Sequence, residues 1–302
     1  MKQQNILITG GSGLVGRSLT SLFLEEGHKV SWLSRSGKSK ENVQGYQWDV
    51  NKGTIDNKAL EWADTVIHLA GEGVANGRWT NAQKKRILDS RIESTKLLRA
   101  SIEEVDNKPS AFISASAIGY YGMDNGERLL MEEDDPGSDF LADVTSKWEE
   151  AIDEITALSI AVTKVRIGVV LSRNGGALEK MSLPIRWGAG AALGSGRQYM
   201  SWIHMDDLCS LIYYLIENNL TGTYNAVSPN PATNKEVTKS IATQLGRPFF
   251  LPNVPTFILK IMLGEMADML LGSSKVSSRK IENAGFKFQF PNLQLGLKNL
   301  LR

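Results

Sequence analysis

The stretch Asn5-Ile-Leu-Ile-Thr9, followed at once by Gly10-Gly-Ser-Gly-Leu-Val-Gly16, joins an apolar run of strand length to a glycine-rich turn. Residues 14–26, which start within this turn, place apolar side chains at helical spacing. Glycine is needed where a chain turns tightly, approaches a pyrophosphate or packs a helix on a strand, and the N–H groups at a helix start attract anions. The sequence therefore predicts a dinucleotide-binding turn. The simpler alternative is a structural turn that binds no ligand.

Strand and helix patterns alternate through the first half of the chain. We expect strands at residues 5–9, 29–34, 46–49, 65–70, 111–116 and 161–171, and helices at residues 14–26, 80–104 and 138–157. Such alternation is typical of a mostly parallel sheet covered by helices on both faces. The predicted fold class is therefore α/β, with a Rossmann-type doubly wound parallel sheet whose ligands lie at the carboxyl ends of the strands.

The regular alternation ends near residue 171, where glycine-rich loops and separate helical stretches begin. Further helices are expected around residues 206–218, 234–245 and 255–271. We predict a Rossmann domain over residues 1–171 and a smaller mixed α/β substrate lobe over residues 172–302, with part of the chain shared between them. The lobe is expected to cover the cofactor face of the sheet.

Composition and charge narrow the possible partners. The chain has 302 residues, 42% of them hydrophobic, and a formal net charge of +1, so no overall field favours nucleic acid or an acidic membrane surface. The single cysteine, Cys209, excludes an intrachain disulfide and fits a reducing compartment. The apolar stretch 257–271 is interrupted by three charged residues, which predicts an amphipathic helix, and the start carries no signal-peptide pattern. We therefore expect a cytoplasmic protein with no membrane and no nucleic-acid partner.

The end of the second predicted strand indicates which nucleotide binds. In NAD-binding folds an acidic residue holds the ribose 2′-hydroxyl there, but this chain has Ser34 and Arg35. A guanidinium pairs well with a phosphate and a hydroxyl adds a hydrogen bond, so the two residues predict NADP(H). The alternative for Arg35 is a solvated loop residue. Asp49 is expected near the adenine amino group, and the stretch Leu69-Ala70-Gly71 under the adenosine.

Several motifs resemble the extended short-chain dehydrogenase/reductase superfamily. They are Thr9-Gly-Gly-Ser-Gly-Leu-Val-Gly16, His68-Leu-Ala-Gly71 and Trp202-Ile-His-Met-Asp-Asp207. Other segments resemble one atypical branch, the sugar-nucleotide-epimerase-like family, whose members end in a C-terminal domain of unknown function. Among them are Arg78-Trp-Thr80, Ser114-Ala-Ser-Ala-Ile-Gly-Tyr-Tyr-Gly122, Arg166-Ile-Gly-Val-Val-Leu171 and Leu263-Gly-Glu-Met266. This resemblance runs nearly end to end, with the C-terminal region at about residues 250–300.

The resemblance implies an NADP(H) site built from several parts of the chain. The diphosphate would be held by Gly10, Ser12, Gly13, Leu14 and Gly16. The 2′-phosphate would meet Ser34 and Arg35, and the adenosine side would be lined by Leu69, Ala70 and Gly71. Further candidates near the cofactor are Glu72 and Arg91, and Arg166 would border the nicotinamide.

The usual catalytic pair of this superfamily is missing. Its members combine Ser or Thr with Tyr-x-x-x-Lys, which puts tyrosine and lysine on one helix face. The ammonium lowers the pKa of the phenol, which moves a proton while hydride moves to or from the nicotinamide. Lys147 matches the lysine, but Asp143 stands where the tyrosine is expected, and no lysine in the chain has a tyrosine four residues before it.

Three readings of the catalytic residues stay open. In the first, Tyr120 or Tyr121 supplies the phenol, while Ser116 polarises a carbonyl and Lys147 keeps a catalytic role. In the second, Asp143 and Lys147 form only an i,i+4 ion pair. In the third, the protein binds NADP(H) and catalyses little.

The second lobe carries the candidates for substrate contact. Arg197, in a glycine-rich loop, is suited to a phosphate or carboxylate, and Trp202 is suited to a pocket wall, although a solvated arginine and a buried tryptophan are the plainer readings. His204 with two adjacent aspartates is a poor ligand set, so no metal is expected. The prediction is an NADP-dependent oxidoreductase or nucleotide-sugar epimerase-like protein, monomeric or homodimeric, with a small polar substrate. The alternative is a non-catalytic NADP(H)-binding regulatory or sensor protein.

Overall fold

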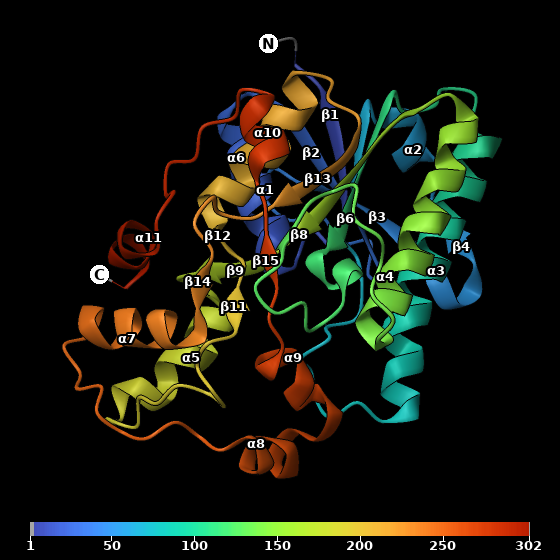
Figure 1. Cartoon of the computed structure of the whole chain (residues 1–302). Coiled ribbons are helices and arrows are strands. Elements are labelled where there is room, and N and C mark those ends of the chain that lie inside the picture. Colours follow the sequence, from blue (N-terminus) through green and yellow to red (C-terminus); the bar gives the residue numbers. More distant parts are fainter. Residues whose placement is uncertain (1–2, 302) are drawn as a thin grey trace.

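An eight-stranded sheet forms the centre of the molecule (Figure 1). The structure is a computed structural model that describes residues 3–301. The strands of this sheet are β1 (Asn5–Thr9), β2 (Lys29–Ser34), β3 (Gln44–Asp49), β4 (Thr54–Ile55), β5 (Thr65–His68), β6 (Ala111–Ala117), β8 (Ala161–Ile167) and β13 (Gly222–Ala226). Their order is β13-β8-β6-β5-β1-β2-β3-β4, and only the β3–β4 pair is antiparallel.

The order of the strands reverses at β1, which lies between β2 and β5. From β1 the chain builds outward to β2 and β3, then returns to β5 and builds in the opposite direction. Ligands of such sheets bind at the carboxyl ends of the strands beside this reversal. The predicted α/β fold with a doubly wound parallel sheet is confirmed.

Helices cover both faces of the main sheet, as Figure 1 shows. One face carries α1 (Leu14–Glu25), α6 (Met205–Glu217) and α10 (Arg279–Asn283), and the other carries α2 (Lys58–Trp62), α3 (Asn81–Glu104) and α4 (Phe140–Asp153). Side chains alternate along β1, so Ile6 and Ile8 join the first core while Leu7 joins the second. The sheet is therefore buried on both faces, as parallel sheets are.

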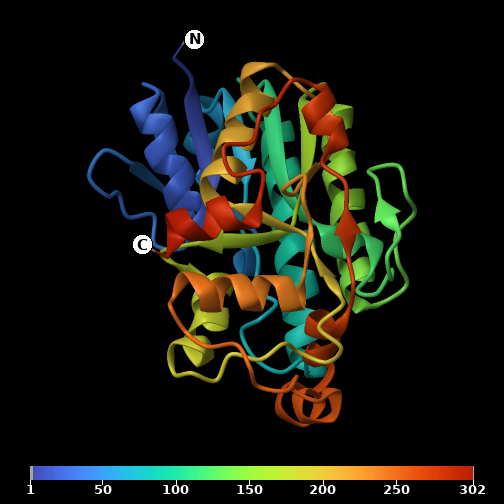
Figure 2. The ribbon, with the colours of Figure 1, turned by 60° about the vertical axis from the view of Figure 1, so that its left-hand side comes forward.

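A second lobe lies beside the carboxyl ends of these strands (Figures 1 and 2). Its short strands are β7 (Leu129–Leu130), β9 (Val169–Ser172), β10 (Gly175–Gly176), β11 (Tyr199–Met200), β12 (Trp202–His204), β14 (Ala232–Thr233) and β15 (Lys275–Val276). Its helices are α5 (Ala177–Arg186), α7 (Asn234–Gln244), α8 (Thr256–Leu263), α9 (Ala267–Leu271) and α11 (Leu293–Leu300). A third core, which contains Leu171, Trp202 and Leu297, holds much of this lobe together.

Two predicted elements are broken by glycine. The strand expected at residues 161–171 is interrupted at Gly168, where the chain passes so close to Ser201 that a Cβ would lie 2.6 Å from its carbonyl oxygen. After this close approach the chain continues as β9 in a different sheet. The helix expected at residues 255–271 divides at Gly264, whose φ of +62° is left-handed, into α8, a short 3₁₀ turn and α9.

The chain crosses between the two lobes more than once. Strand β13 pairs with β8 in the main sheet, and α6 packs on α1, although both elements follow residue 171. The main sheet therefore draws on residues 222–226, which lie inside the predicted range 172–302 of the second lobe. Within residues 3–301, no helix has the length and apolar character needed to cross a bilayer.

Candidate cofactor and catalytic site

Two glycines of the β1–α1 turn, Gly10 and Gly16, lie against backbone that leaves no room for a side chain. Gly10 has φ of +70° and passes over the backbone that follows β5, where a Cβ would lie 3.1 Å from the amide nitrogen of Ala70. A Cβ at Gly16 would lie 2.4 Å from the Gly10 carbonyl oxygen and 2.6 Å from Gly11 Cα. The Gly13 N–H donates to the Gly10 carbonyl at 2.9 Å, which closes the turn. Helix α1 can therefore approach β1 closely only because these residues lack side chains.

The N-terminus of α1 is open to an anion. Gly13 is the N-cap residue, no side chain caps the helix, and no acidic residue occupies its first turn. Ser12 and Gly13 are exposed, and Leu14 is half-buried. The first N–H groups of the helix are thus available to a phosphate at the positive end of the helix dipole. This geometry fits a diphosphate group, because the close packing at Gly10 and Gly16 holds the free N–H groups of α1 at the carboxyl end of β1.

A buried hydrogen-bond network supports this turn from below, and the sequence analysis missed it. Thr9 Oγ1 accepts the backbone N–H groups of residues 69–70 at 3.1 and 3.2 Å and lies 2.7 Å from His68 Nδ1. Since both lone pairs of the hydroxyl are used, its proton is donated to Nδ1 and the imidazole carries its own proton on Nε2. That N–H faces the hydroxyls of Ser94 and Thr95 on α3 at 3.2 and 3.3 Å.

His68 is therefore a neutral structural group. Its side chain is fully buried, and burial, assisted by the charge of Arg91, lowers the pKa of the imidazole to about 3. Protonation at Nδ1 would remove the acceptor of the Thr9 hydroxyl. Since that hydroxyl also holds the backbone that follows β5, the neutral imidazole fixes β1, β5 and α3 relative to one another.

We expect His68 to make the fold sensitive to acid. The unfolded chain takes up a proton near the ordinary value of 6.5 and the folded chain only near 3, so folding stability is full above pH 6.5 and falls as the pH drops toward 3. The cost is about 1.4 kcal/mol for each pH unit in that interval. In an NMR titration the His68 ring should stay neutral at pH 5, whereas in urea it should titrate near 6.5. A midpoint near 6.5 in the folded protein would contradict this.

The residues expected around the adenosine phosphate lie at the ends of β2 and β3. Ser34 Oγ accepts the N–H of Gly37 at 3.2 Å, and Arg35 is exposed. Within residues 3–301 the Arg35 guanidinium makes no hydrogen bond or ion pair, so it is available to a ligand. Asp49 Oδ1 accepts the N–H groups of residues 51–52 at 3.0 and 3.3 Å, so this carboxylate caps the turn after β3.

The loop after β5 is held by Arg91 from α3. Its Nη1 donates to the carbonyls of Glu72 and Ile87 at 3.0 and 2.9 Å, and burial lowers the pKa of the guanidinium to about 10. The Glu72 N–H donates to Ser90 Oγ at 2.9 Å. A side chain at Gly71 would lie 3.3 Å from the guanidinium carbon of Arg91. The arginine thus shapes the backbone beside Leu69 and Ala70.

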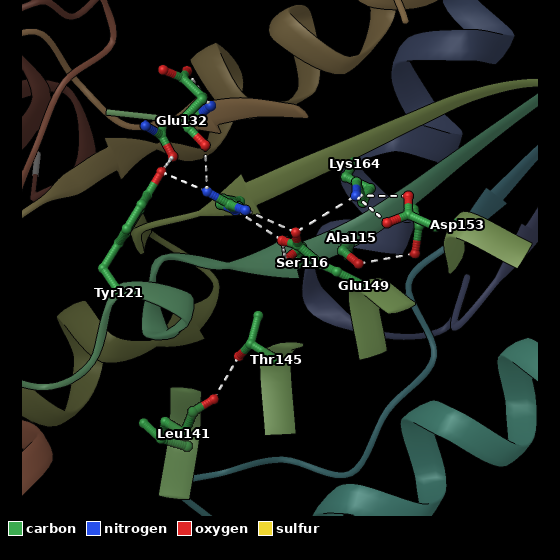
Figure 3. A network of polar contacts seen from close by, with 12 residues as sticks. Ala115, Ser116, Tyr121, Glu132, Leu141, Thr145, Glu149, Asp153 and Lys164 are labelled. Carbon is green, nitrogen blue, oxygen red and sulfur yellow. Dashed lines mark hydrogen bonds and ion pairs between the residues drawn. The ribbon is translucent and has the colours of Figure 1, made fainter. Parts of the chain in front are cut away.

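Three buried residues lie within the larger polar network of Figure 3, two of them near the ends of β6 and β8 and the third on α4. Glu149 on α4 accepts Nε and Nη2 of Arg166 through its two oxygens, each at 2.8 Å, and accepts the Ser116 hydroxyl at 2.5 Å. The register of β6 and β8 places Ser116 opposite Arg166. All three residues are at most 4% exposed. The Ser116 proton is therefore committed to a buried carboxylate.

The same arginine also holds Tyr121. Arg166 Nη1 donates to the Tyr121 oxygen at 2.9 Å and to the Glu132 carbonyl at 3.1 Å, while the Tyr121 hydroxyl donates to Asn225 on β13 at 2.8 Å. Burial raises the pKa of Tyr121 to about 12 despite these contacts. Burial alone would lower the pKa of Arg166, but the bonds and charge of Glu149 outweigh it and raise that pKa. Arg166 thus lies inside this network, and its place beside the nicotinamide stays a prediction.

Tyr120 occupies a different position from its neighbour. Its ring centroid lies 3.5 Å from the guanidinium carbon of Arg166, and its ring meets that of Tyr121 edge-on. The side chain is half-buried, and its hydroxyl makes no hydrogen bond within the described residues 3–301. Of the two tyrosines, Tyr120 therefore keeps a hydroxyl that is free for other contacts.

Lys147 lies apart from this network. Its ammonium pairs with Asp143 one turn earlier on α4 at 2.9 Å, and the two side chains are 47% and 52% exposed. Such a solvent-exposed i,i+4 pair contributes only a few tenths of a kcal/mol, roughly. The geometry matches the reading of Lys147 as one half of a surface ion pair.

Of the residues expected to contact the substrate, one is exposed and the other is buried. Arg197 is exposed in the loop before β11. Trp202 is fully buried in the third core and donates its indole N–H to the carbonyl of Asn230 at 3.0 Å, so it has no surface for a substrate and matches the plainer reading of a buried tryptophan. His204 accepts the N–H of Asp206 and caps α6. Across residues 3–301, no group of three potential metal ligands gathers.

The fold and the β1–α1 turn define a Rossmann-fold protein of the extended short-chain dehydrogenase type. The chain belongs to the NAD dependent epimerase/dehydratase family, which matches residues 6–227, and a domain of unknown function (DUF1731) matches residues 254–300. The predicted family is therefore confirmed, together with its C-terminal domain. Similar proteins are the epimerase family proteins YfhF of Bacillus subtilis and SDR39U1 of Mus musculus, each 36% identical over 98% of this chain and 98% and 99% of their own.

Two solved structures are similar both in sequence and in fold. Human epimerase family protein SDR39U1 (isoform 2) with NADPH has a TM-score of 0.88 and 33% identity over 98% of this chain and 99% of its own. A nucleoside-diphosphate sugar epimerase from Corynebacterium glutamicum has a TM-score of 0.81 and 32% identity over 99% of this chain and 58% of its own. A UDP-N-acetylglucosamine 4-epimerase from Bacillus cereus, 18% identical with a TM-score of 0.78, shares the fold.

Proposed function

We propose that this protein binds NADP(H) at the β1–α1 turn and exchanges hydride with a small polar substrate. The observation that carries the proposal is the uncapped N-terminus of α1, which the close backbone packing at Gly10 and Gly16 brings to the carboxyl end of β1. The human relative whose structure contains NADPH supports the choice of cofactor. Fluorescence titration of the full chain with NADPH tests it, and a lack of saturable binding would leave only a structural turn.

The proposed roles follow the strand ends. The N–H group of Leu14 and the Ser12 hydroxyl would bind the diphosphate beside Gly13, whose own N–H is donated to the Gly10 carbonyl. The stretch 69–71 would line the adenosine. Ser34 and Arg35 would bind the 2′-phosphate, and Asp49 would face the adenine. Glu72 and Arg91 would set the shape of the loop on the adenosine side.

We expect that Arg35→Ala weakens NADPH binding by about 10- to 100-fold, because a charged hydrogen bond to phosphate contributes roughly 1–3 kcal/mol. NADH binding should change less than about twofold, since NADH has no 2′-phosphate. Paired titrations with the two cofactors measure this. Lys40→Ala is a matched control, because Lys40 is an exposed cation of the same β2–β3 loop, and it should leave both affinities unchanged. An equal loss for both cofactors in Arg35→Ala would refute the role.

In the proposed reaction, the Tyr120 hydroxyl donates or accepts the proton that moves together with the hydride. Ser116 and Tyr121 donate their protons to Glu149 and Asn225, whereas the Tyr120 hydroxyl has no such partner within the described part of the chain. The Arg166 guanidinium, 3.5 Å from the Tyr120 ring centroid, would hold the ring and favour negative charge on it. Ser116, Tyr121 and Arg166 then act as positioning residues. NADP(H) would supply or accept the hydride.

This chemistry is tested by adding small polar compounds, including nucleotide sugars, to the protein with bound NADPH. A substrate is detected by oxidation of the cofactor. With a substrate found, Tyr120→Phe should lower kcat by about 10²- to 10⁴-fold, the usual worth of a proton donor. Tyr121→Phe should act mainly on stability. If Tyr120→Phe turns over normally, the assignment is wrong.

The second candidate function is a non-catalytic NADP(H)-responsive protein. It is favoured by one observation, namely that Lys147 pairs with Asp143 at the surface and no tyrosine accompanies it. Tight NADPH binding without turnover of any compound in the screen would favour this candidate.

The oligomeric state, monomeric or homodimeric, stays a prediction that light scattering tests. The cytoplasmic location stays a prediction that cell fractionation tests.

A further inference from the structure

Exposed apolar side chains gather on two stretches of the second lobe. Of the ten large apolar side chains that are exposed within residues 3–301, eight belong to residues 180–190 and 247–263. They are Leu183, Trp187, Phe250, Leu251, Phe257, Ile258, Ile261 and Met262, and we call them together the apolar end. A concentration of this kind marks an interaction surface, because single exposed apolar side chains are normally scattered.

The two stretches lie along one end of the molecule. In Figures 1 and 2 the last turn of α5, the loop after α7 and α8 all lie at the end of the second lobe that is remote from α10. A Cβ at Gly190 would lie 3.7 Å from the carbonyl oxygen of Pro248, so the two stretches are in contact. Trp187 is 83% exposed, Phe250 74% and Ile261 70%. The apolar end is therefore one region and not two separate patches.

Helix α8 presents these side chains from a fixed position. Arg78, in the loop before α3, donates to the carbonyls of Ile261 and Met262 at 2.7 and 3.1 Å and so caps the last turn of the helix. Lys84 on α3 pairs with Glu265 just beyond it. Within α8 only Leu259 is buried. The apolar side chains thus point outward on a helix that is tied to the main domain.

The charged residues within the two stretches are all positive, although the exposed Glu179 borders the first of them. The two stretches contain Lys180, Arg186, Arg247 and Lys260 and no aspartate or glutamate, whereas the whole chain has a net charge of only +1. Arg186 and Arg247 are exposed. Of the acidic residues that border the second stretch, Glu265 pairs with Lys84 and Asp268 with Lys260. The surface therefore combines apolar side chains with a local excess of positive charge.

We propose that the apolar end docks on an anionic lipid bilayer surface. Outward aromatic and aliphatic side chains enter the headgroup boundary of a bilayer, and lysine and arginine beside them are attracted by anionic lipids. A tryptophan such as Trp187 is suited to that boundary. A second copy of the chain fits less well, because a symmetric contact would bring two sets of these cations together.

This inference does not depend on the proposed function. The apolar end lies on the second lobe, while the β1–α1 turn belongs to the main domain. The sequence predicted an amphipathic helix at residues 255–271 and no membrane partner. It did not predict the apolar end, because periodicity does not show which face of a helix is exposed. Docking on a bilayer surface needs no spanning segment.

Vesicle sedimentation with the full chain tests the proposal. The protein should sediment with vesicles of phosphatidylcholine and phosphatidylglycerol at low salt, and much less with phosphatidylcholine alone or at high salt. The double variant Phe257→Ser with Ile261→Ser should bind at least about tenfold more weakly, since two apolar side chains no longer leave water. Arg186→Glu with Arg247→Glu should remove the preference for anionic vesicles.

Leu295→Ser on α11 is the matched control, because Leu295 is an exposed leucine, at 48%, outside the apolar end, and this variant should bind as the parent does. Since all replaced side chains are exposed, the melting temperatures should stay unchanged. Two results would overturn the proposal. One is a lack of binding to anionic vesicles. The other is a dimer, seen by light scattering, that Phe257→Ser with Ile261→Ser dissociates while vesicle binding is unchanged.

Discussion

Glu149→Ala will lower the free energy of unfolding by about 3–5 kcal/mol, the usual cost of leaving a buried charge without its partner. The substitution removes both hydrogen bonds of Arg166 at 2.8 Å and the only acceptor that the Ser116 hydroxyl has within residues 3–301. Arg166 is 3% exposed, so water cannot replace the carboxylate. Lys164, 3.7 Å from Glu149, loses part of its counter-charge as well. Urea unfolding followed by circular dichroism measures the change.

The same helix offers a matched control for that measurement. Asp143→Ala removes one half of the Asp143–Lys147 pair, whose side chains are about half exposed, and should cost about 0.5 kcal/mol or less. The double variant Glu149→Leu with Arg166→Met removes both buried charges together and should recover much of the loss. Equal losses in Glu149→Ala and Asp143→Ala would show that burial does not govern this ion pair.

Gly16→Ala will weaken NADPH binding by about a hundredfold and destabilise the fold by about 1–3 kcal/mol. The added Cβ would lie 2.4 Å from the Gly10 carbonyl oxygen and 2.6 Å from Gly11 Cα, and both atoms belong to the backbone of the turn. Helix α1 then has to move away from β1, and its first N–H groups move with it. A loss of two charge-assisted hydrogen bonds accounts for an effect of this size. Calorimetric titration and thermal unfolding measure the two effects.

Gly190→Ala is the control for added volume at a glycine. The nearest atom to a Cβ there is Ile185 Cγ1 at 3.5 Å, an ordinary contact, so affinity and stability should both stay near those of the parent. An unchanged NADPH affinity in Gly16→Ala would mean that the cofactor does not use the start of α1. That outcome would remove the observation on which the proposed function rests.

Local pattern was sufficient to predict the parallel main-sheet strands that lie before residue 160, but not the two-residue antiparallel strand β4. Residues 5–9 and 29–34 are buried apolar runs, and the structure confirms both ranges. The prediction of one strand at 161–171 missed the interruption at Gly168 and the change of sheet for residues 169–171, because the close approach of Ser201 to Gly168 comes from a distant part of the chain. Periodicity also could not predict that β13 joins the main sheet, because the pairing of β13 with β8 depends on the tertiary fold.

The candidate site also has a part that could be predicted from the sequence and a part that could not. The glycine turn could be predicted, because its residues are contiguous and each serves a backbone requirement. The network of Ser116, Glu149 and Arg166 could not, since it depends on the register between β6 and β8 and on the rotation of α4. The support that His68 gives to Thr9 was likewise invisible, although a histidine that ends a buried strand is a usable signal for a structural hydrogen bond.

Strand β13 has a consequence for the order in which the chain is made. When residue 171 leaves the ribosome, β8 still has one unpaired edge, and open edges of this kind pair readily with other chains. That edge closes only when Gly222–Ala226 arrive to pair with residues 163–167. The nascent protein is therefore exposed to aggregation while residues 172–221 are synthesised, and a translational pause in that interval would present an unfinished sheet to chaperones and proteases.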